Sequence, residues 1–133
     1  MGVLDKLLNE IKDISVKLDE ANANDWLALM GVTHALQVQS QALIDIIERL
    51  LANMGISVMG YREAAVKLRE LGLLNDEEYR FLLSVIGFRN IVIHEYIGVD
   101  FNLIKGILVK KEYRKVLELA LRLRERAERY WDP

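Results

Sequence analysis

The stretch VTHALQVQSQALIDIIERLL, residues 32–51, decides the fold of this chain. Its apolar side chains recur every three or four positions, which is the spacing of an amphipathic α-helix. With one leucine upstream they make a continuous stripe, which consists of Leu29, Val32, Leu36, Leu43, Ile46, Ile47 and Leu50. The stretch therefore predicts one long helix, which Gly55 can end by adopting a positive φ.

The same helical period continues on both sides of this stretch, whereas the alternating pattern of β-branched residues that marks strands is missing. Upstream, residues 4–18 predict a first helix, and the polar residues 20–25 predict a connection. Downstream, residues 61–71 predict a shorter helix that stops at Gly72.

Capping residues mark the later helices. Asn75 is a good N-cap for a helix that runs into residues 88–96, and the three acidic residues after it suit the positive end of the helix dipole. Gly98 is the expected end of this region. Asp100 then caps a further helix, and a last helix is expected to end near Tyr130.

These elements predict an all-α fold, a compact bundle of five or six helices joined by short connections. A chain of 133 residues has the length of one typical domain, and 52% of it is apolar, which is enough for a core. No internal repeat or low-complexity tract divides it. We therefore expect a single helical domain over residues 1–133.

The composition excludes several classes of protein. No apolar run approaches the roughly 18 residues that span a bilayer, and the acidic N-terminus does not suit a signal peptide, so we expect a cytoplasmic protein without a membrane segment. Cysteine is absent, which rules out disulfides and thiolate metal sites.

The net charge of −2 argues against a general nucleic-acid coat. Residues 100–133 carry nine basic and six acidic side chains, which form either a modest basic surface or an ordinary solvated helix face.

Residues 88–96, FRNIVIHEY, set polar side chains into an apolar run. Arg89 can hold a phosphate, and His94 can move a proton near neutral pH. On a helix, Asn90 and His94 lie four positions apart on one face, so Asn90 can hydrogen-bond the imidazole. Tyr96 projects to nearly the same side as Arg89 if the helix continues that far. The three apolar residues between Asn90 and His94 are expected to anchor the segment in the core.

In a second interpretation of this segment, its polar residues have structural roles and no catalytic one. Arg89 would pair with a carboxylate, such as that of Glu95 or Asp45, and His94 would cap a helix C-terminus; spacing alone leaves both interpretations open. A zinc-protease HExxH pattern fails because position 98 is glycine. No phosphate-binding loop and no metal-ligand spacing of histidines occurs, so neither a metal nor a cofactor is expected.

The pattern R-N-x-x-x-H-x-Y, formed by Arg89, Asn90, His94 and Tyr96, resembles the motif of the HEPN superfamily, specifically of its HepT-like branch. The long helix is similar to that of the branch. So are the order and spacing of YREAAVKLRELGLL and FRNIVIHEY. The resemblance runs from near Val32 to Phe101, and the motif itself shows no departure.

This resemblance implies a compact helical homodimer that cleaves RNA as the toxin of a type VII-like toxin–antitoxin system. The implied partner is a minimal nucleotidyltransferase antitoxin, usually encoded by the adjacent gene, which transfers AMP to the motif tyrosine and inactivates the toxin. Carried over to this chain, Arg89 and His94 are the catalytic pair and Asn90 is a supporting residue. Tyr96 is the implied AMPylation site, although an ordinary interface tyrosine fits the sequence too.

Metal-independent RNA cleavage needs a base for the 2′-OH, an acid for the leaving 5′-oxygen, and positive charge beside the phosphorane oxygens. One chain supplies one such histidine, His94, so a two-fold dimer is expected to bring two copies of His94 and Arg89 to a composite cleft. The alternative is a catalytically silent helical dimer that binds a partner nucleotidyltransferase or a nucleotide. The same motif fits both hypotheses.

Polar residues also follow one face of the long helix, namely His34, Gln37, Gln41, Asp45 and Glu48. Part of this stripe lines the expected dimer cleft, or it is a solvated face; for His34 both interpretations stay open. Asp45, between two isoleucines, is the better candidate for a buried or interface position. It can orient Arg89 from there.

Overall fold

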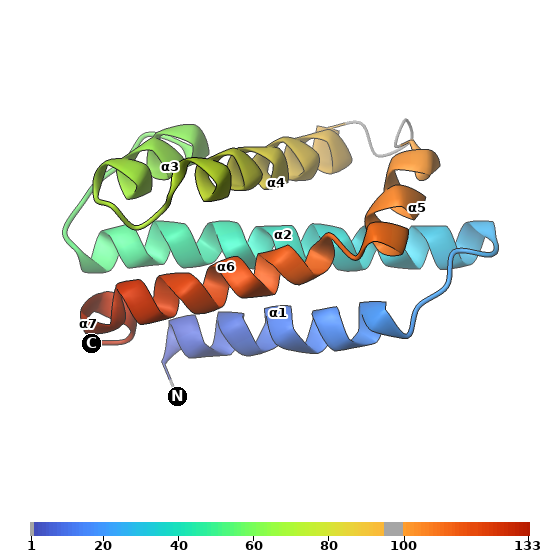
Figure 1. Ribbon diagram of the computed structural model, residues 1–133, viewed down its shortest axis with the longest axis horizontal. Helices are drawn as coiled ribbons and strands as arrows, with labels where there is room; N and C mark the ends of the chain where they lie inside the picture. Colours follow the sequence, from blue (N-terminus) through green and yellow to red (C-terminus); the bar gives the residue numbers. More distant parts are fainter. Residues whose placement is uncertain (1, 95–99) are drawn as a thin grey trace.

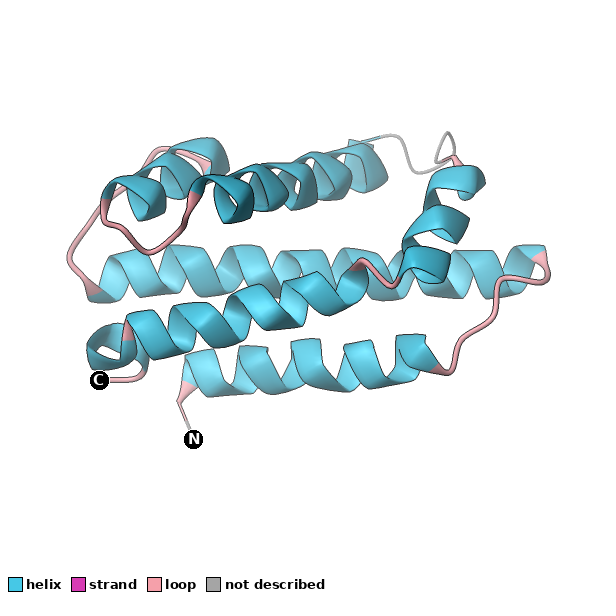
Figure 2. Ribbon diagram, in the orientation of Figure 1, coloured by secondary structure: helices cyan, strands magenta, loops and turns pink. Residues whose placement is uncertain are grey.

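The computed structural model describes residues 2–94 and 100–133, and within them it contains helices and no strand. The predicted all-α fold is confirmed (Figure 2). The helices are α1 (Val3–Asp19), α2 (Trp26–Asn53), α3 (Tyr61–Glu70), α4 (Asp76–His94), α5 (Phe101–Lys110), α6 (Tyr113–Arg126) and α7 (Glu128–Trp131). These described residues thus hold seven helices where five or six were predicted. The short α7 is separate because the backbone leaves helical geometry at Ala127 (φ −120°, ψ 32°).

Helix α2 is the axis of the bundle and contacts all six other helices. It runs along the length of the molecule with α3 and α4 on one side and α1 on the other, and α5 stands at a steep angle to the rest (Figure 1). A helix surrounded in this way must be apolar over most of its circumference. This explains why Ile44 and Leu51, which lie off the predicted stripe, are also completely buried.

The core has two parts, both built on α2. The larger cluster joins α2 to α1, α3, α4, α6 and α7, and it includes the predicted Leu43, Ile46, Ile47 and Leu50, none of which is exposed. The smaller cluster consists of Leu18, Leu29, Val32, Leu36, Ile104 and Tyr113. Packing along the whole of α2 fixes which of its side chains face α4, the helix that carries the motif.

Most helix ends follow from local chemistry, as predicted. Gly55 and Gly72 both adopt a φ of +77°, a backbone conformation that residues other than glycine rarely adopt. Asp100 caps α5 by accepting a hydrogen bond from the backbone N–H of Asn102 at 2.8 Å. The expected stop at Gly98 lies outside the described residues.

The start of α1 is capped from the other end of the chain. The carboxylate of Asp132 accepts hydrogen bonds from the backbone N–H groups of Leu4 and Asp5, both at 3.0 Å. Trp131 Nε1 donates to Asp5 Oδ1 at 2.9 Å, and Trp131 is buried. Asp132 approaches Gly2 so closely that a Cβ on residue 2 would lie 2.2 Å from Asp132 Cγ. The two ends of the chain are therefore joined, and they lie at the same end of the bundle (Figure 1).

Candidate active site

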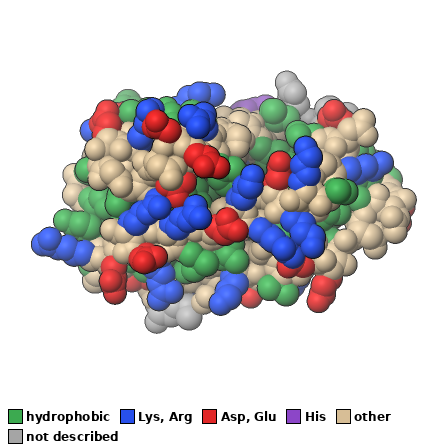
Figure 3. Space-filling view, viewed as in Figure 1, with side chains coloured by type: hydrophobic (Ala, Val, Ile, Leu, Met, Phe, Trp, Pro, Cys, Tyr) green, Lys and Arg blue, Asp and Glu red, His purple; other side chains and the backbone are tan. Residues whose placement is uncertain are grey.

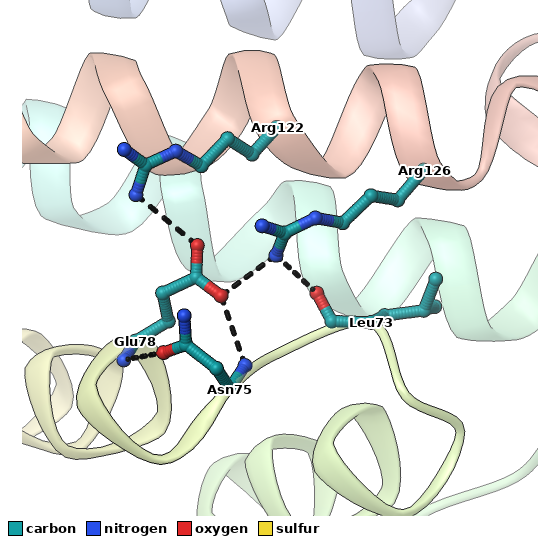
Figure 4. A network of polar contacts seen from close by, with 5 residues as sticks. All are labelled: Leu73, Asn75, Glu78, Arg122 and Arg126. Carbon is teal, nitrogen blue, oxygen red and sulfur yellow. Dashed lines mark hydrogen bonds and ion pairs between the residues drawn. The ribbon is translucent and has the colours of Figure 1, made fainter.

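The motif helix α4 is anchored at its start by a capping box. Asn75 Oδ1 accepts from the Glu78 N–H at 2.8 Å, and Glu78 Oε1 accepts from the Asn75 N–H at 2.9 Å. The Glu78 side chain, only 5% exposed, also accepts hydrogen bonds from Arg126 at 2.7 Å and Arg122 at 3.2 Å, both on α6 (Figure 4). Arg126 further donates to the Leu73 carbonyl at 3.0 Å. One carboxylate thus ties the start of α4 to α6.

The pKa of Glu78 reflects two opposing effects. Burial of the carboxyl acts to raise its pKa, while hydrogen bonds from Arg126, the Asn75 backbone and Arg122 lower it. The hydrogen bonds and the positive charge of Arg126 prevail, so the pKa of Glu78 lies below its ordinary value of 4.5. Glu78 is accordingly a carboxylate at neutral pH.

Farther along α4, the half-buried Arg89 is held by neutral groups. Its Nε donates to Gln41 Oε1 on α2 at 2.8 Å, and its Nη1 donates to Asn90 Oδ1 at 3.1 Å. The guanidinium carbon lies 5.2 Å from the ring centroid of Tyr61, the first residue of α3. Gln41 Nε2 in turn donates to Asp45 Oδ1 at 2.9 Å. Residues from three helices therefore converge on Arg89.

No ion pair between Arg89 and a carboxylate, the alternative that the sequence left open, occurs among the residues that the structure describes. Asp45, one of the two partners considered, accepts from Gln41, and Gln41 stands between it and Arg89. The structure therefore does not show the direct pairing with Asp45 that the sequence left open; Asp45 is joined to Arg89 through Gln41. Glu95, the other partner considered, lies outside the described residues.

Glu48, one turn after Asp45 on α2, completes the electrostatic surroundings. Burial raises the pKa of Glu48, the negative charge of Asp45 raises it further, and the positive charge of Arg89 opposes them. The pKa of Glu48 lies above its ordinary value as a result. Arg89 therefore lies close enough to Glu48 to act on its carboxyl through charge, without forming an ion pair with it.

His94 is exposed at the end of α4, on the same helix as Arg89. The structure describes both residues and shows no hydrogen bond between Asn90 and this imidazole; the bond that Asn90 makes is with Arg89, through Oδ1. Asn90 therefore supports the arginine of the motif and not the histidine. Tyr96 lies outside the described residues.

Gln41 is the residue whose importance the sequence did not reveal. The sequence placed it in a polar stripe on α2 and gave it no role of its own. Its spacing of four from Asp45 was the available signal, since such pairs meet on a helix surface. Gln37 is half-buried, and His34 is exposed without a partner in the described part of the chain.

Comparison with known protein families gives one result. Residues 4–123 match the family described as HepT-like, Ribonuclease HepT-like. The chain belongs to the HepT-like family. No curated protein and no solved structure gave a significant match. Membership of this family makes ribonuclease activity the expected activity of this HepT-like chain. The match also extends the resemblance seen between Val32 and Phe101 to most of the sequence.

The apolar residues within the motif of this HepT-like chain were expected to lie in the core, and only one of them does. Val92 is completely buried, whereas Ile91 is 44% exposed and Ile93 is 42% exposed. Ile91 also borders a hollow of about 320 Å³ between α2, α4, α5 and α6, which Phe88 and Leu103 help to line. The apolar part of the motif is therefore only partly in the core.

Lys and Arg side chains are interspersed with Asp and Glu side chains on the face that α6 crosses (Figure 3), and α6 belongs to the basic C-terminal part of this HepT-like chain. Four arginines there are engaged in ion pairs: Arg114 with Asp19, Arg122 and Arg126 with Glu78, and Arg124 with Asp5. Much of the local excess of positive charge is therefore balanced within the fold.

Neither a metal cluster nor a membrane helix occurs in the described part of this HepT-like chain. No group of three or more His, Asp or Glu side chains there is arranged to hold a metal ion. None of the helices has the length and apolar character needed to cross a bilayer.

Proposed function

We propose that this protein is a metal-independent endoribonuclease, the toxin of a type VII-like toxin–antitoxin system, with Arg89 and His94 as its catalytic pair. The observation that carries this proposal is the setting of Arg89. It is half-buried and is held by Gln41, Asn90 and Tyr61, none of which carries a charge that would neutralise it. A guanidinium held in this way keeps its positive charge for a phosphate.

His94 supplies the proton chemistry in this proposal. It lies exposed one turn after Asn90, on the same helix as Arg89. In the proposal, the RNA approaches His94 from solvent, with one phosphate bound to Arg89 and the neighbouring ribose beside His94. In the reaction, a base takes the proton of the 2′-OH, the 2′-oxygen attacks the adjacent phosphorus, and an acid protonates the departing 5′-oxygen. Arg89 stabilises the charge that develops on the phosphorane oxygens.

A dimer completes the site, because each chain supplies one histidine of the motif. A two-fold axis near the end of α4 would place two His94 side chains at one cleft, as base and acid. The exposure of Ile91 and Ile93 supports this position for the dimer contact, since both lie between Asn90 and His94 in the motif.

The proposed regulator is a minimal nucleotidyltransferase that transfers AMP to Tyr96. This part rests on the family motif, in which Tyr96 follows His94 by two residues. An AMP group so close to His94 would repel the phosphates of RNA and obstruct the cleft.

Cleavage of RNA by the purified protein in the presence of EDTA tests the proposed activity. We expect Arg89→Ala and His94→Ala to reduce cleavage by at least about a hundredfold, the size of one general acid–base or electrostatic contribution. His34→Ala is the matched control, because His34 is the other histidine and is also exposed. Full activity of His94→Ala would contradict the proposal, and an inactive but dimeric wild type would favour the catalytically silent alternative.

A further inference from the structure

We propose that Gln41 is a positioning residue for Arg89, which orients the guanidinium toward a phosphodiester without placing a negative charge against it. The effect of Gln41 on catalysis rests on the function proposed above, whereas the contact between Gln41 and Arg89 does not depend on it. Gln41 lies 48 positions from Arg89 in the sequence and on a different helix. No part of the motif includes it.

The orientation of the Gln41 amide is fixed by Asp45. A carboxylate can only accept hydrogen bonds, so the amide NH₂ of Gln41 must face Asp45, at 2.9 Å. Its carbonyl oxygen then faces Arg89 and accepts from Nε at 2.8 Å. Asp45 thus determines which end of Gln41 meets Arg89, although it does not touch the arginine.

Arg89 is held along one edge as a result. A guanidinium has five N–H donors, and the single N–H of Nε is used by Gln41 while one N–H of Nη1 is used by Asn90. The ring of Tyr61 supports the face of the group. The remaining N–H groups, including those of Nη2, have no acceptor among the residues 2–94 and 100–133, and in the proposal they bind the phosphate oxygens.

The neutrality of Gln41 is essential to this arrangement. A carboxylate at position 41 would form a charge-assisted pair with Arg89 and compete with phosphate for it. An apolar side chain would leave the Nε donor half-buried and unsatisfied, and Arg89 would be free to turn toward Asp45 or Glu48. Glutamine satisfies Nε and stands between Arg89 and the Asp45 carboxylate.

Binding of a 2′-O-methyl RNA oligonucleotide, followed by fluorescence anisotropy, tests the proposal without cleavage. Gln41→Met keeps the length of the side chain and removes both hydrogen bonds, and we expect it to weaken binding about tenfold, as for one hydrogen bond to a charged group. Gln41→Glu should weaken it more. In the Arg89→Ala background, Gln41→Met should have no further effect, because its action passes through Arg89.

The matched control is Gln37→Met, one turn earlier on α2, where the glutamine is half-buried but has no partner among the described residues. The second readout is the Nε–H cross-peak of Arg89 in a ¹⁵N–¹H spectrum, identified by its loss in Arg89→Ala. We expect Gln41→Met to shift this peak and to speed its exchange with water, and Gln37→Met to leave it unchanged. An Nε–H peak that is the same in wild type and Gln41→Met overturns the proposal, whatever the RNA experiments give.

Failure of this proposal and failure of the proposed function give different results. If the wild type does not cleave RNA but the Arg89 peak responds to Gln41→Met, the ribonuclease assignment fails and the positioning role stands. The other case is a wild type that cleaves RNA through Arg89 and His94 while Gln41→Met matches Gln37→Met in cleavage rate, RNA affinity and the Arg89 Nε–H peak. In that case the positioning role is refuted and the ribonuclease assignment stands.

Discussion

Arg89 Nε on α4 donates a 2.8 Å hydrogen bond to Gln41 Oε1 on α2, so the motif arginine is attached to the central helix of the bundle. The position of its guanidinium therefore depends on how α2 and α4 pack, and not on the motif segment alone. His94 has no such attachment in the described part of the chain. The two proposed catalytic residues differ in how firmly the monomer holds them.

The first prediction concerns the dimer contact. Ile91→Glu places a charge on a surface that we expect to be covered, and it should produce monomers and abolish RNA cleavage together. Sedimentation equilibrium and cleavage assays measure the two effects. Val109→Glu on α5, where the side chain is 80% exposed, is the control and should leave both unchanged. Dimers of Ile91→Glu that still cleave RNA would place the interface elsewhere.

The second prediction concerns Tyr96. Incubation with the neighbouring minimal nucleotidyltransferase and ATP should add one AMP to the protein and suppress cleavage, because the nucleotide brings negative charge next to His94. Intact-mass and peptide mass spectrometry detect the adduct. Tyr96→Phe should remain unmodified and active under the same conditions. An adduct on Tyr61 or another tyrosine would refute this assignment.

The third prediction concerns the buried carboxylate of Glu78. Glu78→Gln weakens its bonds to Arg122 and Arg126, and we expect it to lower the free energy of unfolding by about 1–3 kcal/mol, as for a buried group that loses charge-assisted hydrogen bonds. Urea denaturation measures the change. Glu77→Gln, in the same first turn but exposed, should stay within about 0.5 kcal/mol of the wild type.

The fourth prediction follows from the lowered pKa of Glu78. A carboxyl whose pKa is lower in the folded than in the unfolded protein stabilises the fold above its unfolded pKa, ordinarily 4.5. That stabilisation is lost as the pH falls through the lower, folded value. The difference in unfolding free energy between wild type and Glu78→Gln should therefore be constant from pH 6 to 8 and shrink below about pH 4.5. A difference that grows in acid would mean that the pKa is raised.

The fifth prediction concerns the cap that Asp132 provides for α1. Asp132→Ala should lower the free energy of unfolding by about 1 kcal/mol, the usual value of an N-cap. Gly2→Ala should have a similar effect, because its Cβ displaces the Asp132 carboxylate. The double variant should be no less stable than the worse single variant, since both changes remove one interaction. Asp13→Ala, an exposed position on α1, is the control.

Local features of this fold were predictable and long-range ones were not. Gly55, Gly72, Asn75 and Asp100 act on backbone groups within a few residues, so their chemistry is visible in the sequence. The cap by Asp132 joins residues more than 120 positions apart, and only the packed bundle brings them together.

The candidate site divides in the same way. Helical spacing placed Arg89, Asn90 and His94 on one helix correctly. It did not predict that Asn90 bonds the arginine, because a guanidinium competes with the imidazole for the same oxygen. Nor could it predict the exposure of Ile91 and Ile93, since an apolar side chain fits a core and a subunit contact equally well.

The contacts of α2 with every other helix have a consequence for how the molecule opens. No helix can be removed from the bundle without exposing part of α2, and α2 itself cannot separate unless the whole core is lost. Its central amide protons should therefore exchange with solvent only through global unfolding, whereas those at the end of α4 exchange through local fraying. Gln41 and Asp45 thus belong to the part of the protein that opens last, and His94 to a part that opens early.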